Sequence, residues 1–281
     1  MRGLTIGKLR GLQSIANADG IFTICAMDHR GSLRRMIARD SPEKVSYEEM
    51  VRRKVELCSS LAPQASAVLL DPIYGAAQCI SQGALPGGVG LLVSIEATGY
   101  EGDPEHRVTR LLDGWSVAKI KRMGASAVKI LVYYRPDLAE LSGKQRDTVS
   151  RVARECLDYD IPFLVEPISY PVGGELSEPE QFAARKAELV IRTAEEMTAL
   201  PIDVLKAEFP ADLRYTTDRR ELDTRCRQLS QASRVPWVIL SAGVDFETFF
   251  RQVEIACQAG ASGFLGGRAI WQEAMEIEDP G

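Results

Sequence analysis

Two apolar segments of strand length each contain a lysine. The first reads Ala127-Val128-Lys129-Ile130-Leu131-Val132-Tyr133-Tyr134, and the second reads Val204-Leu205-Lys206-Ala207-Glu208-Phe209. An ammonium group that is removed from water costs several kcal/mol unless it is paired or gives up its proton. A lysine that has given up its proton is a nucleophile. The two segments therefore indicate both a sheet-containing fold and covalent chemistry.

Similar β-rich segments recur along the chain, and helix-like segments separate them. Several of these strands are apolar throughout, which is typical of parallel strands buried on both faces by helices. Alternation of strand and helix eight times in 281 residues predicts a (β/α)8 barrel, the TIM-barrel class of α/β fold. A doubly wound open sheet is the alternative, although it usually has about five or six strands. The expected strands are Ile21 to Asp28, Ser66 to Pro72, Gly90 to Glu96, Ala127 to Tyr134, Pro162 to Ser169, Val204 to Pro210, Pro236 to Gly243 and Gly263 to Ala269.

No linker rich in Pro, Gly or Ser divides the chain, so we expect one domain over residues 1–281. Residues 1–20 are expected to form an N-terminal helical cap. Residues 171–180 are expected to form a long loop after the fifth strand, on the side where barrels carry their chemistry.

Composition excludes several classes of protein. The net charge is −5 and basic residues are interleaved with acidic ones, which argues against a nucleic-acid-binding protein. No apolar stretch approaches the length of a membrane span, and the first 20 residues are too polar for a signal peptide. We therefore expect a cytoplasmic protein that does not bind membranes.

The cysteines and histidines limit the metal chemistry. The six cysteines are scattered without a C-x-x-C pair and fall mostly at apolar positions, which predicts reduced core thiols. His29 and His106 are the only two histidines, so a zinc site built on several histidines is excluded. A carboxylate-rich magnesium site stays open on this evidence.

Polar residues at the strand ends are the candidate catalytic residues, because barrels place their active sites at the carboxyl ends of the strands. Lys206 and Glu208 share a face because strand side chains alternate with period two. Each residue also has a plainer interpretation: Asp28 could cap the next helix, Glu96 could be a solvated loop carboxylate, and a strand lysine could extend to water. Asp71, before a proline, is interpreted as a turn residue. The candidates are Asp28, Glu96, Lys129, Glu166, Lys206, Glu208 and Ser241.

Convergence of these groups at one barrel mouth would have a chemical purpose. Burial and a second ammonium nearby both favour the neutral form of a lysine. A neutral amine attacks a carbonyl to form a Schiff base, and carboxylates such as Glu166 and Asp28 could move the protons.

The ends of the last two strands indicate a phosphate site. Leu240-Ser241-Ala242-Gly243 ends the seventh strand and Gly263-Phe264-Leu265-Gly266-Gly267-Arg268 ends the eighth. Barrels commonly bind phosphate there, on backbone N–H groups that glycines leave accessible. Arg268 could add charge-assisted hydrogen bonds. The alternative is that these glycines serve tight packing.

As an ordered set, these motifs are similar to those of the tagatose-1,6-bisphosphate aldolase family, class I (Schiff-base) barrel aldolases related to the sulfofructosephosphate aldolases. The resemblance covers about residues 7 to 275. It is carried by Asp28-His29-Arg30-Gly31-Ser32-Leu33, Leu70-Asp71-Pro72-Ile73-Tyr74-Gly75, the segments around Lys129 and Lys206, Leu240-Ser241-Ala242-Gly243 and Gly267-Arg268-Ala269.

The resemblance implies a role for each candidate. Lys206 would form the Schiff base with the ketose C2 carbonyl, with Lys129 as the second active-site lysine. Glu166 would be the general acid/base, and Asp28 would position or deprotonate a substrate hydroxyl. Ser241, Gly243, Gly267 and Arg268 would hold a phosphate.

The chain also departs from the family pattern. Family members typically read Asp-Gln-Arg where this chain reads Asp28-His29-Arg30, which leaves the contacts at the distal end of the sugar open. Arg30 and His29 are candidates for a distal anion, and Glu96 is assigned to substrate binding. The family also usually continues further past the last strand. No metal and no cofactor are expected, and the resemblance suggests a homo-oligomer.

The expected function is a reversible, metal-independent aldol cleavage of a phosphorylated ketohexose, with tagatose 1,6-bisphosphate as substrate and dihydroxyacetone phosphate and glyceraldehyde 3-phosphate as products. A sulfofructosephosphate aldolase with the same mechanism is the alternative within the class. A non-catalytic barrel that senses a sugar phosphate, or a phosphosugar isomerase or epimerase without a covalent lysine, are the alternatives outside it.

Overall fold

Eight parallel strands, each paired with its neighbour in chain order, close into a barrel in the computed structural model, which describes residues 4–275. β1 closes the barrel against β8, with Phe22 opposite Gly263. The predicted (β/α)8 barrel is confirmed, and the open sheet is wrong. The strands are β1 Phe22–Met27, β2 Ala67–Leu70, β3 Gly90–Ser94, β4 Ala127–Tyr133, β5 Phe163–Ile168, β6 Val204–Ala207, β7 Trp237–Leu240 and β8 Gly263–Gly266.

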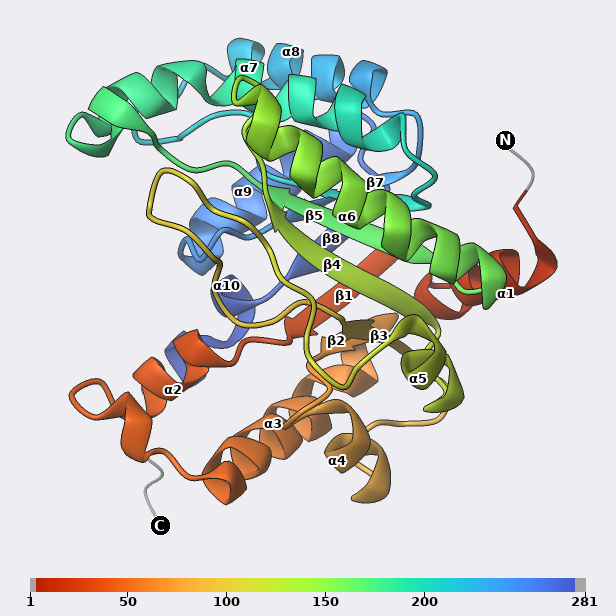
Figure 1. Cartoon of the computed structure of the whole chain (residues 1–281). Coiled ribbons are helices and arrows are strands. Elements are labelled where there is room, and N and C mark those ends of the chain that lie inside the picture. The colour runs from red at the N-terminus through yellow and green to blue at the C-terminus, as the bar shows by residue number, and fades with distance from the viewer. Residues whose placement is uncertain (1–3, 276–281) are drawn as a thin grey trace.

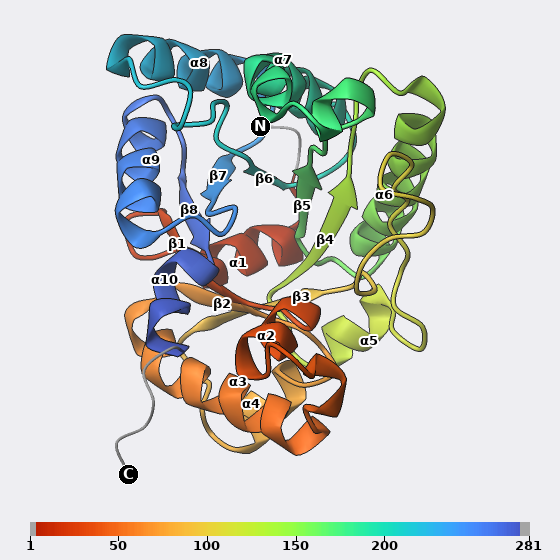
Figure 2. The same cartoon turned by 90° about the vertical axis from the view of Figure 1, so that its left-hand side faces the viewer.

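Helices form a ring outside the strands (Figures 1 and 2). Several begin at residues whose side chains accept a hydrogen bond from the first turn, as Ser46 does from the Glu49 N–H and Asp245 does from the Thr248 N–H. The helices are α1 Ile6–Ile15, α2 Gly31–Ile37, α3 Tyr47–Leu61, α4 Ala76–Ser81, α5 Val117–Arg122, α6 Ala139–Asp158, α7 Pro179–Thr198, α8 Arg219–Ala232, α9 Phe246–Gln258 and α10 Arg268–Trp271. Short 3-10 turns lie at Pro42–Lys44, Ala62–Gln64, Gly173–Leu176 and Glu273–Met275.

The N-terminal end of the barrel is closed by α1, which lies across it at the right of Figure 1. Ile15 of α1 is buried in the same cluster as the inward-facing strand residues, among them Ile24 and Leu92. Lys8 of α1 forms a buried ion pair with Asp203, 2.7 Å from Nζ to Oδ2. Access to the barrel is therefore from the carboxyl ends of the strands, the side that faces the viewer in Figure 2.

The strands are shorter than the sequence predicted. Asp28, Glu96, Glu208 and Ser241 each lie one or two positions beyond the last strand residue, where the backbone has left the hydrogen-bonded ladder. The expected long loop over residues 171–180 is wrong in part. A 3-10 turn occupies Gly173–Leu176, and α7 already begins at Pro179, because proline fits the first position of a helix.

Five cysteines are buried, as expected, whereas Cys257 is exposed. In residues 4–275 no helix is both long and apolar enough to cross a membrane.

Candidate active site

A cavity of about 610 Å³ lies at the carboxyl ends of the strands. Figure 2 views the barrel from the carboxyl ends of its strands. Every site residue predicted from the sequence lines the cavity: Asp28, His29, Arg30, Glu96, Lys129, Glu166, Lys206, Ser241, Gly243, Gly267 and Arg268.

Lys129 of β4 lies at the centre of three carboxylates. Its Nζ is 2.6 Å from Glu96 Oε1, 2.9 Å from Asp28 Oδ2 and 2.9 Å from Glu166 Oε2. Only 1% of the lysine side chain is exposed. The energetic cost of burying this ammonium is thus offset by ion pairs on three sides.

The charge state of Lys129 is set by these three ion pairs and not by burial. Burial alone would lower its pKa, but the charges of Asp28, Glu166 and Glu96 outweigh burial and hold the pKa well above its ordinary value. The sequence could not show that three carboxylates surround this one amine. Lys129 is therefore a permanent ammonium ion at neutral pH.

Lys206 of β6 has a different environment. Its Nζ lies 2.7 Å from Glu166 Oε1, and 5% of the residue is exposed. Glu166 of β5 thus bridges the two lysines, with one carboxylate oxygen on each. Burial would raise the pKa of Glu166, but the positive charges of Lys129 and Lys206 outweigh it and lower the pKa below the ordinary value. Glu166 is therefore ionised, and it lies within hydrogen-bonding distance of Lys206.

Asp28 follows β1 and is not a helix cap. α2 begins at Gly31 without a side-chain cap, and the Asp28 carboxylate faces Lys129 instead. Burial opposes its ionisation, but the neighbouring Lys129, His29 and Lys206 lower the pKa of Asp28 far below its usual range. The interpretation of Glu96 as a solvated loop carboxylate is wrong as well, because its side chain is only 7% exposed and contacts Lys129.

Ser241, Gly243, Gly267 and Arg268 lie together at the ends of β7 and β8, and we call them the anion corner. The Gly267 N–H donates to Ser241 Oγ at 3.3 Å. Ala242 and Gly243 have φ values of +49° and +74°, so two successive residues are in the left-handed region. A Cβ on Gly243 would lie 2.6 Å from Arg268 Nη2, so the guanidinium packs directly on the glycine backbone. Within the described chain, Arg268 Nε is buried without a hydrogen-bond partner.

Arg30 and His29 lie between β1 and α2. His29 is next to the anion corner, since a Cβ on Gly267 would lie 2.6 Å from its Cε1. Arg30 Nη2 donates to the Glu96 carbonyl oxygen at 2.6 Å, and its Nη1 is buried without a partner in residues 4–275. His29 packs edge-on against Trp271 at 5.2 Å between ring centroids. Burial lowers the pKa of His29 to about 4 despite the opposing charge of Asp28, so the ring is neutral at physiological pH.

A match to a known family covers most of the chain. The family model described as "DeoC/LacD family aldolase" matches residues 22–273. The chain belongs to the DeoC/LacD aldolase family. It is an aldolase, a carbon–carbon lyase. The "Tagatose 1,6-diphosphate aldolase 1" of Enterococcus faecalis is 32% identical over 98% of this chain and 87% of its own. The "Tagatose 1,6-diphosphate aldolase" of Listeria monocytogenes serotype 4a is 35% identical over 98% of this chain and 84% of its own.

Solved structures agree with this assignment at the level of the fold. A Schiff-base-forming fructose-1,6-bisphosphate aldolase superposes with a TM-score of 0.64 at 21% identity, over 93% of this chain and 92% of its own. A fructose-bisphosphate aldolase from Slackia heliotrinireducens gives a TM-score of 0.66 at 16% identity, over 96% of this chain and 80% of its own. Both are barrels like this aldolase.

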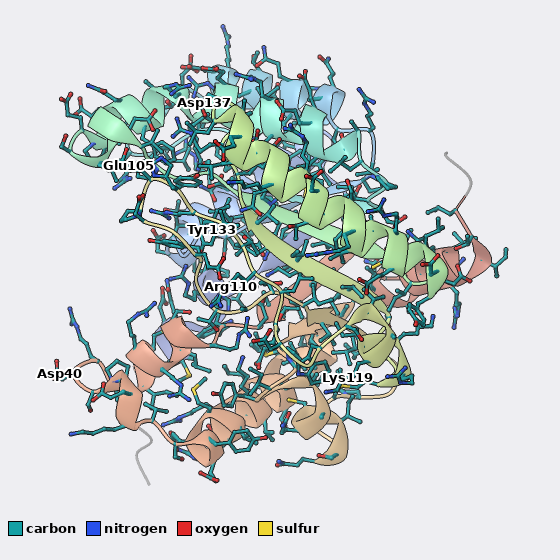
Figure 3. The ribbon with its side chains drawn as sticks, in the orientation of Figure 1. Asp40, Glu105, Arg110, Lys119, Tyr133 and Asp137 are labelled. Carbon is teal, nitrogen blue, oxygen red and sulfur yellow. The ribbon has the colours of Figure 1, made fainter. Side chains whose placement is uncertain are left out.

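The cavity of the aldolase also contains residues that sequence reasoning missed. Tyr133 lies on the same face of β4 as Lys129, nearer the mouth, and the alternation of strand side chains could have identified it. Figure 3 labels it together with Glu105 and Arg110 of the loop between β3 and α5. The Arg107 guanidinium packs over the Tyr133 ring at 5.6 Å and over the Tyr170 ring at 4.8 Å.

Glu208 lies apart from the other predicted carboxylates. It lines the cavity, as its position on the face of Lys206 predicts. Its carboxylate, however, accepts hydrogen bonds from the Ser169 N–H at 2.8 Å and the Ser169 hydroxyl at 2.6 Å, and it pairs with Lys186. A neighbouring cavity of about 870 Å³ shares Glu208 but contains neither active-site lysine.

Proposed function

We propose that this aldolase cleaves a phosphorylated ketohexose, tagatose 1,6-bisphosphate, into dihydroxyacetone phosphate and glyceraldehyde 3-phosphate through a Schiff base on Lys206. One observation carries the proposal: Glu166 bridges two buried lysines whose environments differ, with three carboxylates on Lys129 and one on Lys206.

This asymmetry assigns the two lysines different roles. An amine held by three carboxylates keeps its proton and is a poor nucleophile. Lys206, whose single ion pair within the described residues is with Glu166, is the amine that can pass a proton to a carboxylate and attack a carbonyl. Lys129 then acts as a fixed positive charge that holds Glu166, Asp28 and Glu96 in place.

The reaction follows from these positions. Lys206 Nζ attacks the ketose C2, and Glu166 supplies the proton with which the C2 oxygen leaves as water. The iminium accepts the electrons of the C3–C4 bond as the C4 hydroxyl passes its proton to Glu166, which is a carboxylate again once water has left, and the aldehyde leaves. Glu166 then returns this proton to C3 of the enamine. Asp28, across Lys129 from Glu166, positions the substrate hydroxyls. Protonation of the enamine at C3 and hydrolysis of the iminium then release dihydroxyacetone phosphate and the free lysine.

The anion corner supports a phosphorylated substrate. Arg268 offers a buried donor without a partner among the described residues, next to the left-handed backbone of Ala242 and Gly243. A guanidinium beside backbone of this conformation favours the binding of a phosphate group. The curated relatives from Enterococcus faecalis and Listeria monocytogenes, named as tagatose 1,6-diphosphate aldolases, support the choice of sugar.

Borohydride trapping tests the covalent step. Reduction in the presence of dihydroxyacetone phosphate should attach the three-carbon unit to Lys206, as read by peptide mass spectrometry. Lys206→Met should form no adduct and lose turnover, whereas exposed Lys119→Met should behave like the wild type. Excess EDTA should leave turnover unchanged. Absence of an adduct in the wild-type aldolase would sink the proposal, and so would retention of turnover in Lys206→Met, which is what an isomerase or epimerase without a covalent lysine predicts.

The same preparation tests the substrate. Values of kcat/KM should be higher for tagatose 1,6-bisphosphate than for sulfofructose 1-phosphate. A higher value for the sulfonate would assign this chain to the sulfofructosephosphate aldolases. Binding of sugar phosphates without any turnover would favour the sensing barrel.

A further inference from the structure

A buried ion pair lies outside the cavity, behind the ends of β1 and β2. Lys54 of α3 and Asp71, directly after β2, are both fully buried, with Nζ 2.6 Å from Oδ2. Neither residue lines the catalytic cavity. The mutual attraction of a buried pair seldom repays the full cost of removing both charges from water. The presence of this pair therefore calls for a role beyond stability.

Asp71 is the fixed half of the pair. Its Oδ1 accepts hydrogen bonds from the Ile73 N–H at 2.9 Å and the Tyr74 N–H at 2.8 Å, so the predicted turn role is confirmed. The turn backbone holds this carboxylate in one orientation, with Oδ2 directed at Lys54. Asp71 thus anchors an ammonium group at a defined place.

From this position beside Asp71, Lys54 forms a hydrogen bond to the end of β1. Its Nζ donates to the Met27 carbonyl oxygen at 2.5 Å. Met27 is the last residue of β1, and it pairs in register with Leu70, the residue before Asp71. A buried carbonyl at a strand end needs a donor from outside the ladder. Lys54 is that donor, and it ties the ends of two neighbouring strands together.

The residue after Met27 is Asp28, whose carboxylate lies 2.9 Å from Lys129. Because the peptide unit between Met27 and Asp28 is planar, a rotation about the Met27 Cα–C bond turns the Met27 carbonyl away from Lys54 and moves the Asp28 backbone with it. We infer that Lys54, anchored by Asp71, is a positioning residue that holds Asp28 against Lys129 for the cleavage step. This inference rests on the proposed function, in which Asp28 orders the substrate hydroxyls.

Three variants of the full chain separate positioning from stability. Lys54→Met with Asp71→Asn removes both charges and the donor to Met27. Asp71→Asn alone keeps the donor. Lys8→Met with Asp203→Asn is the matched control, because it removes a buried ion pair of 2.7 Å at the opposite end of the barrel.

The Lys54→Met, Asp71→Asn variant should have a kcat lower by about tenfold or more, with KM changed by less than about twofold. Displacement of a catalytic group by about 1 Å lowers the rate by up to about a hundredfold. The control pair should keep kcat within about threefold of the wild type, even where its melting temperature falls, and the kcat of Asp71→Asn alone should lie between those of the two double variants because it keeps the donor but loses the anchor. Borohydride should still trap dihydroxyacetone phosphate on Lys206 in all three, because Lys206 contacts Glu166 and not Asp28.

A crystal structure of the Lys54→Met, Asp71→Asn variant gives a readout independent of turnover. Asp28 should have moved away from Lys129. An Asp28–Lys129 contact that stays at 2.9 Å overturns the inference, as does a kcat equal to that of the control pair. Failure of the wild-type protein to form an adduct would instead contradict the proposed function, and the crystallographic distance would still decide the positioning role.

Discussion

Lys129 and Lys206 differ in the number of carboxylates that surround them, and this difference organises the site at the scale of residues. Both side chains are almost fully buried, and at Lys129 burial alone would lower the pKa of the amine. Three carboxylates reverse that effect at Lys129, whose pKa is raised. Against the effect of burial, the Lys129 ammonium also lowers the pKa of Glu166, the carboxylate that exchanges a proton with Lys206 in the proposed reaction.

Replacement of Lys129 by methionine should therefore slow turnover without preventing adduct formation. The variant leaves Asp28, Glu96 and Glu166 without their shared positive charge, so the pKa values of Asp28 and Glu166 should rise and proton transfer should become slower. We expect kcat to fall about a hundredfold or more, the usual range for loss of acid–base catalysis. Steady-state kinetics and borohydride trapping with dihydroxyacetone phosphate measure the two effects. A variant that turns over normally but cannot be trapped would reverse the roles of the two lysines.

The sequence predicted the members of this site but not their charges. Lys129, Lys206, Asp28 and Glu166 were identified from their places at strand ends, because a barrel brings all strand ends to one mouth. The charge state of Lys129 depends on separations below 3 Å between side chains from different strands, which no local pattern encodes. Lys54 was missed for the same reason, since in the sequence it is an ordinary helix residue.

At the scale of elements, the two lysines and Glu166 lie inside their strands, whereas Asp28 and Ser241 lie just beyond the last strand residue. Backbone beyond the ladder can adopt conformations that a strand forbids, and the turn after β7 does so at Ala242 and Gly243. The sequence predicted the glycines of this turn from their position. It did not predict that Arg268, from the end of β8, would pack on Gly243.

Replacement of Gly243 by alanine should weaken phosphate binding. The new Cβ would lie 2.6 Å from Arg268 Nη2, so the guanidinium must shift, and the φ of +74° adds backbone strain. We expect KM to rise about tenfold, roughly the loss of one charge-assisted hydrogen bond, with a smaller change in kcat. Gly83→Ala is the matched control, because φ is +69° there and no atom lies within 4 Å of the added Cβ. Equal KM values for the two variants would contradict a phosphate site at this turn.

At the scale of the whole molecule, the two ends of the barrel differ: one end holds an apolar core and the other holds the candidate active site. Its N-terminal end is filled by α1 and apolar side chains, whereas its open end gathers charged groups whose pKa values are displaced. Such displacement links folding to pH, because a group that binds protons differently in the folded and unfolded chain makes stability depend on pH. His29 should show this effect at pH values between its folded and unfolded pKa values, a range in which unfolding is easily measured.

The folded chain should lose stability between pH 6.5 and about 4 because of His29. Its pKa falls from the ordinary 6.5 to about 4 on folding, so in this window the unfolded chain binds the proton and the folded chain does not. The stabilising effect is complete above pH 6.5 and is lost as the pH falls toward 4. One such group contributes at most about 1.4 kcal/mol per pH unit, and less here because 22% of the ring side chain is exposed.

Urea unfolding at pH 7, 5.5 and 4.5 measures this dependence, with the pH values chosen to span the window set by His29. His29→Gln places a side chain that does not titrate at the same position, so its free energy of unfolding should fall less between pH 7 and 4.5 than that of the wild type. His106→Gln replaces an exposed histidine, so its free energy of unfolding should change with pH as that of the wild type does. The free energy of unfolding could instead change equally with pH in His29→Gln and in the wild type. That result would mean that His29 binds a proton as readily in the folded aldolase as in the unfolded chain, and that water reaches the ring beside Trp271.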